Sequence, residues 1–133
     1  MQFARCLCAV FALSTSQAYA AETQISVHLD NVKQMEAACR LTFVAQNAFE
    51  QDVNRIVLET VAFDTKGSVA SMTLFDFQKI PAGSMRVRQF DLPNMSCAAL
   101  GSLLVNGVQT CESDVDCEDA LTVSSRTDVA LQG

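Results

Sequence analysis

The chain has 133 residues, a formal net charge of −6, one histidine and no tryptophan. This acidic balance argues against nucleic acid and anionic membrane surfaces as partners, because both carry negative charge themselves. One histidine and one tyrosine leave few side chains for acid–base catalysis or for stacking on a sugar ring.

Residues 1–20 have the features of a secretory signal peptide. Arg5 is their only charge, residues 6–16 are largely apolar, and Ala18-Tyr19-Ala20 places small residues where signal peptidase requires them. We therefore expect residues 21–133 to form the mature domain, with a net charge of −7 after the loss of Arg5, in the periplasm or secreted. The apolar stretch is too short to cross a bilayer, so we expect no membrane insertion after signal removal.

Short predicted strands follow. Residues 24–30 alternate between apolar and polar, which turns the apolar residues to a core and places His28 on the solvent face. Residues 55–63 are apolar on both faces, as is typical of a central strand. Further strands are predicted at residues 41–45, 69–77, 85–92, 103–108, 121–123 and 129–131, with one helical turn within 96–101.

Two turns interrupt the central strands. Residues 64–67 place Gly67 where a positive φ is needed, and Pro81 starts a second turn at 80–83. In the strand after it, regular alternation would put Arg86 and Arg88 on the same face as Phe90. We predict a bulge near Gln89 that turns Val87 and Phe90 both inward. The two arginines then either guard a strand edge or bind an anionic ligand.

This pattern predicts a single all-β domain, an immunoglobulin-like antiparallel β-sandwich of about seven short strands. The predicted core comprises Ile25, Val27, Leu29, Leu41, Phe43, Ile56, Leu58, Val61, Phe63, Leu74, Phe75, Val87, Phe90 and Leu104.

Four cysteines remain after signal removal: Cys39, Cys97, Cys111 and Cys117. Outside the cytoplasm an even number predicts disulfides, and zinc is disfavoured because no C-x2-C pair is present. Antiparallel strands place Cys39 and Cys97 at one end of the sandwich. The strand at 103–108 then carries Cys111 more than about 20 Å away from Cys97, beyond the reach of a disulfide. We predict the pairs Cys39–Cys97 and Cys111–Cys117.

Carboxylates crowd residues 112–119. Asp114, Asp116 and Glu118 are the calcium candidates, since Ca²⁺ takes six to eight oxygen ligands. The run lacks the D-x-D-x-D-G order of a calcium loop, so we expect a solvated acidic loop and no metal site, with calcium binding as the alternative.

No catalytic constellation is visible in the sequence. Ser124 and Ser125 have no base nearby, because His28 lies in the first strand and a hydrolase would need it to cross the sandwich. No G-x-S-x-G motif is present. We expect neither an enzyme nor a cofactor. Residues 94–96 fit a glycosylation sequon, which matters only in a host that glycosylates.

The segment Val61-Ala62-Phe63-Asp64-Thr65-Lys66-Gly67, followed by a strand and then Ile80-Pro81-Ala82-Gly83, resembles the immunoglobulin-like FxLYD domains of bacterial secreted proteins. The aromatic residue, the Asp and the Gly match, whereas Thr60 and Ala62 replace the leading Phe and Leu of that family. The chain as a whole is also similar to small exported bacterial proteins that contain LTLFDF (MTLFDF in this chain), RVRQFDL and a cysteine-bounded tail ending in SSRTD. Both resemblances imply a sandwich with an interaction or structural role.

Export, fold class and the lack of catalytic residues together favour a non-enzymatic periplasmic or secreted module that binds a protein partner or supports envelope structure. The alternative is a protein that binds calcium or a small ligand through the acidic loop at 112–119.

Overall fold

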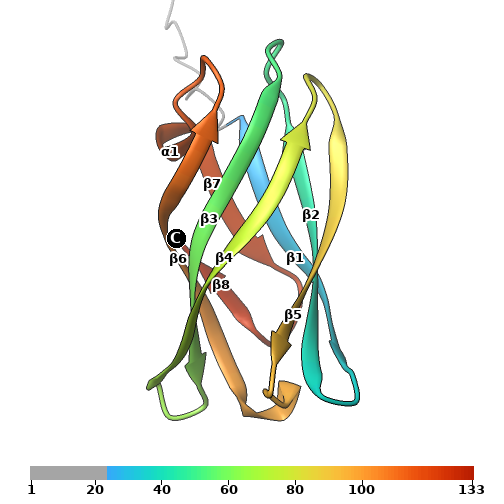
Figure 1. The fold of residues 1–133 in the computed structure, drawn as a ribbon, viewed down its shortest axis with the longest axis vertical. Coiled ribbons are helices and arrows are strands. Elements are labelled where there is room, and N and C mark those ends of the chain that lie inside the picture. Colours follow the sequence, from blue (N-terminus) through green and yellow to red (C-terminus); the bar gives the residue numbers. More distant parts are fainter. Residues whose placement is uncertain (1–23) are drawn as a thin grey trace, which may run out of the picture.

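A computed structural model describes residues 24–133, and the predicted signal peptide over 1–20 lies outside the described residues. Two four-stranded sheets pack face to face as a sandwich (Figure 1). The elements in chain order are β1 (Ile25–Gln34), β2 (Ala38–Asn47), β3 (Val53–Asp64), β4 (Val69–Ile80), β5 (Met85–Pro93), η1 (Cys97–Ala99), β6 (Leu100–Glu112), α1 (Cys117–Ala120), β7 (Leu121–Ser125) and β8 (Ala130–Gln132).

The all-β sandwich is confirmed, with eight strands in the described residues. The first sheet has the strand order β5-β2-β1-β7 and the second has β4-β3-β6-β8. The sheets are mixed rather than wholly antiparallel, because β7 runs parallel to β1 and β8 parallel to β6. The helix α1 carries the chain from the end of β6 to the other sheet. There β7 starts at the same end of the sandwich as β1, so the two strands run in the same direction (Figure 1).

The core lies between the two sheets. Ile25, Leu29, Leu41 and Ile56 are each fully buried there, as predicted. Phenylalanines from both sheets meet within it: the rings of Phe75 on β4 and Phe90 on β5 stack 4.4 Å apart, and Phe43 and Phe77 pack around them. Helical structure in the described residues is limited to the short segments η1 and α1, and no helix there is long and apolar enough to cross a membrane.

Several predicted core residues lie elsewhere. Leu74 is 51% exposed and Val87 is 57% exposed, while Phe63 and Leu104 are only half-buried. Val61 is buried, but it alternates with the core residues of β3 and lies on the outer face of the second sheet. The physical reason is that β3 and β4 have apolar residues on both faces, so the alternation of residue types does not tell which face is inward.

The predicted bulge near Gln89 is wrong. β5 pairs with β2 in unbroken register from Pro93 to Met85, so Val87 points outward and Arg86 and Arg88 share the inward side with Phe90. An edge strand tolerates arginines on this side because their long side chains reach the open margin of the sandwich.

The turns follow their predicted chemistry. Gly67 has φ +82° and Gly83 has φ +64°, both in the left-handed region that favours glycine. The Asp64 carboxylate accepts hydrogen bonds from the backbone N–H groups of Lys66 and Ser68, which holds the first turn closed.

Candidate functional site

Both predicted disulfides are confirmed. Cys39 and Cys97 are bonded with their Cα atoms 4.9 Å apart, where β2 begins and β5 has just ended. Cys111 and Cys117 are bonded with their Cα atoms 6.1 Å apart at the opposite end. The long strand β6 separates the two bridges, as the prediction required.

The three calcium candidates do not come together. The Asp116 carboxylate caps α1, since its Oδ1 accepts hydrogen bonds from the N–H groups of Glu118 and Asp119, each at 3.1 Å. Asp114 lines a polar hollow beside Asp52, whereas Glu118 lines a different hollow between β6 and β7. Within residues 24–133 no group of three His, Cys, Asp or Glu side chains is placed to hold a metal ion.

His28 lies on the outer face of the first sheet, as predicted, but it does have a serine beside it. Parallel pairing of β1 and β7 puts Ser124 opposite His28, and a hydrogen bond of 2.8 Å joins its Oγ to the histidine Nδ1. The expectation that His28 would have to cross the sandwich is therefore wrong. The sequence did not predict that β7 pairs with β1. No carboxylate in the described residues bonds the other ring nitrogen, so the pair lacks the group that orients a catalytic histidine.

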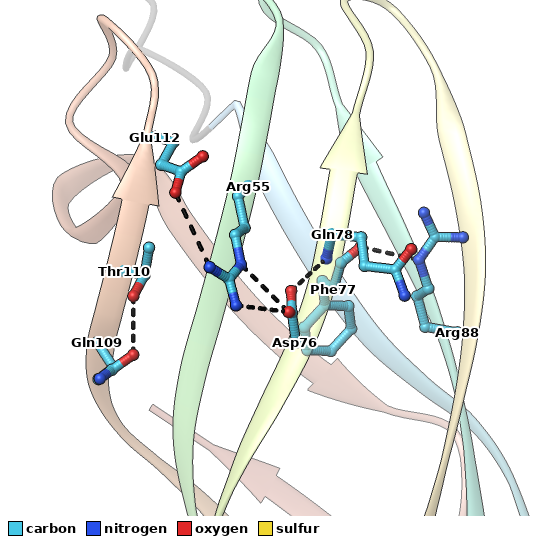
Figure 2. A network of polar contacts seen from close by, with 8 residues as sticks. All are labelled: Arg55, Asp76, Phe77, Gln78, Arg88, Gln109, Thr110 and Glu112. Carbon is cyan, nitrogen blue, oxygen red and sulfur yellow. Dashed lines mark hydrogen bonds and ion pairs between the residues drawn. The ribbon is translucent and has the colours of Figure 1, made fainter.

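A polar network crosses the second sheet on its outer face (Figure 2). The guanidinium of Arg55 on β3 donates to Asp76 Oδ2 on β4 at 2.9 Å and lies 3.9 Å from Glu112 on β6. The hydrogen bond from Arg55 lowers the pKa of the Asp76 carboxyl, and the backbone N–H of Gln78 adds to this effect. Gln78 has φ +59° just beyond a bulge in β4, so this network stabilises an irregular stretch of the strand.

Arg88 connects the two sheets at their open margin. Its Nε donates to the carbonyl of Phe77 at 2.8 Å (Figure 2), and its Nη2 donates to the carbonyl of Lys79 at 3.1 Å. Both carbonyls belong to β4, the edge strand of the other sheet. Of the two predicted roles for the arginines, Arg88 therefore fits the protection of a strand edge.

An apolar surface covers part of the outer face of the second sheet, and we call it the apolar face. It comprises Val57, Val61, Phe63, Met72, Leu74 and Leu104. Met72, Val61 and Leu104 lie side by side in register across β4, β3 and β6. Met72 is 59% exposed. Sequence reasoning missed this surface because it assigned several of the same residues to the core.

The margin opposite Arg88 holds a groove between β6 and β7 of about 570 Å³. Its apolar lining comes from Val105, Val108, Leu121, Val123 and Leu131, and its one charged lining side chain is Glu118. Val108, Leu121 and Val123 are half-buried and pack against the core, so the floor of the groove is apolar.

No family model matches the chain, and no significant match appears among curated proteins or solved structures. The resemblance to FxLYD-type domains therefore stays a prediction.

Proposed function

We propose that this protein is a non-enzymatic exported module, periplasmic or secreted, that binds a protein partner through the apolar face. The observation that carries the proposal is the exposure of Met72 and Leu74, each more than half accessible, next to further apolar side chains in register on β3 and β6. Contiguous apolar surface exposed to water costs free energy in an isolated domain and commonly marks an interaction site.

Export is supported by two independent features. Residues 1–20 have the composition of a signal peptide, and two disulfides join all four cysteines of the described residues. Disulfides form and persist mainly in oxidising compartments. A protein partner suits the apolar face better than a small ligand does, because this face is the outside of a sheet and not an enclosed pocket.

The test is affinity purification from the exported fraction, with mass spectrometry of the proteins recovered. Three baits are compared: the wild-type protein, Met72→Lys, and Val87→Lys as a matched control. Val87 is also exposed and apolar, at 57%, but it lies on the outer face of the other sheet. Lysine on an exposed edge strand is well tolerated, so all three baits should fold.

We expect one or more proteins to be enriched by the wild type and by Val87→Lys and to be lost with Met72→Lys. If no protein is enriched, or if the same set is recovered with all three baits, the apolar face is not a partner site.

A further inference from the structure

The groove between β6 and β7 is a second surface, distinct from the apolar face, and it exists because β8 is short. β8 pairs with β6 only from Ser102 to Leu104, whereas β6 continues to Glu112. Beyond that point, no strand of the described residues covers the second edge of β6. The space above β8 is bounded by β6, by β7 and by α1. Leu131, Gln132 and Gly133 close its lower end, where Gly133 lies against Val105 and Val123.

The charged residues around this groove are acidic. The segment 97–125, which forms η1, β6, α1 and β7, contains five Asp or Glu residues and no Lys or Arg. Glu118 lies in the groove itself, and Asp119 follows it on α1. An occupant that carries positive charge is therefore favoured, and a second copy of this acidic chain is disfavoured by like-charge repulsion.

The backbone of β6 does not offer a regular edge for strand addition. Its pairing with β3 skips Asn106 and Gln109, which are extra residues on β6 and form bulges. Bulges of this kind discourage an added strand. Recognition must then come from side chains entering the groove, whose floor of Val105, Val108 and Val123 is apolar.

We propose that the groove binds a short extended segment of a partner protein, which places apolar side chains between β6 and β7 and a lysine or arginine beside Glu118. This combination follows from the lining, since an apolar floor with one charged group at its rim selects an apolar chain with one opposite charge.

The test measures binding of labelled synthetic peptides to the exported protein by fluorescence anisotropy. The first peptide alternates valine with threonine and ends in lysine; the second replaces lysine with glutamate; the third replaces the valines with serines. The protein variants are Glu118→Lys and, as a control, Glu36→Lys. Glu36 is exposed in the turn between β1 and β2, at the end of the sandwich away from α1 (Figure 1).

We expect the lysine peptide to bind the wild type saturably, with a dissociation constant below about 1 mM. Glu118→Lys should weaken this binding about three- to tenfold, as reversal of one exposed charge pair does, and Glu36→Lys should leave it unchanged. The glutamate peptide should bind Glu118→Lys better than it binds the wild type. Recovery of binding by this charge swap excludes misfolding of the variant as the cause of the loss.

Three results would overturn the proposal: no saturable binding of the lysine peptide, equal binding of the serine peptide, or equal weakening by Glu36→Lys. A concentration-dependent dimer that is lost in Glu118→Lys would assign the groove to a second copy instead. Failure here leaves the apolar face untouched, because Met72 and Leu74 lie outside the groove.

Discussion

Two polar side chains, Asn47 and Thr60, are buried in the described part of the chain. Asn47 has hydrogen-bond partners there for its amide, whereas Thr60 has none there for its hydroxyl. The Asn47 amide donates to the carbonyls of Gln51 and Ile80, and its Oδ1 accepts from the backbone N–H of Phe49. It therefore fastens the loop after β2 to the end of β4. The Thr60 hydroxyl has no hydrogen-bond partner in the described residues. Burial of an unpaired hydroxyl lowers stability.

Replacing Thr60 with valine should therefore stabilise the domain. Thr60→Val keeps the branched shape and removes the unpaired hydroxyl, so we expect the free energy of unfolding to rise by about 1 kcal/mol. Thr60→Ser keeps the hydroxyl and removes a methyl group, and it should lower stability by about 1 kcal/mol. Urea denaturation measures both changes. A Thr60→Val variant less stable than the wild type would show that the hydroxyl is hydrogen-bonded in solution.

Among the elements, the two margins where the edge strands of the sheets meet differ in structure. At one margin Arg88 of β5 satisfies two carbonyls of β4, and the phenylalanine cluster lies behind it. At the other margin no cation lies along β6 or β7 as far as Arg126, and the groove remains open. The first margin is closed by a side chain, whereas the second is accessible to an incoming segment.

The arginines of β5 offer a matched pair of substitutions. Arg88→Met removes the donors to the Phe77 and Lys79 carbonyls, and we expect a loss of about 1–3 kcal/mol in the free energy of unfolding. Arg86→Met is the control, because the hydrogen bond of Arg86 is donated to the carbonyl of Met85 on its own strand. Its stability should stay close to that of the wild type. Equal losses in the free energy of unfolding for both variants would mean that the hydrogen bonds from Arg88 to β4 add nothing to stability.

One disulfide lies near each end of the molecule, and the two disulfides close loops of different length. Cys39–Cys97 spans 58 residues and Cys111–Cys117 spans 6. In the chain-entropy model these loops correspond to about 4 and about 2 kcal/mol of stabilisation.

Removal of each bridge should reproduce this order. The double variant Cys39→Ala with Cys97→Ala should lose most of the stability of the domain, because small domains have only about 5–15 kcal/mol in total. Cys111→Ala with Cys117→Ala should lose less and keep the sandwich. Thermal unfolding followed by circular dichroism measures both. A larger loss from the second pair would show that the acidic loop, and not the junction of β2 with η1, limits stability.

The pH dependence of stability is also a property of the whole surface. The pKa values of Asp52, Asp76 and Asp91 all lie below the usual range, through hydrogen bonds from the Ala82 backbone, from Arg55 and from Arg40 respectively. Carboxyl groups with a lower pKa in the folded state stabilise it above the unfolded pKa of about 3.9, and this contribution disappears as the pH falls through the folded values.

We therefore expect the melting temperature to fall as the pH is lowered below about 4. Asp91→Asn and Arg40→Gln each remove the same ion pair, so both should flatten this acid dependence to a similar degree. A wild-type melting temperature that does not change below about pH 4 would mean that these surface pairs contribute nothing measurable.

Alternation, glycine at positive φ and strand direction are local or additive properties, and from them the strands, the turns and the pairing of the cysteines could be predicted. Residues 24–30 and 55–63 became strands as predicted, and Gly67 turned where a positive φ was required. The sheet edges that β7 and β8 join became known from the folded molecule alone. β7 joined the edge of β1 and brought Ser124 to His28, and the short pairing of β8 left the groove open beside β6. Such contacts join residues far apart in the chain, and they depend on which sheet edges the other strands leave unpaired. No local pattern of residues encodes that choice.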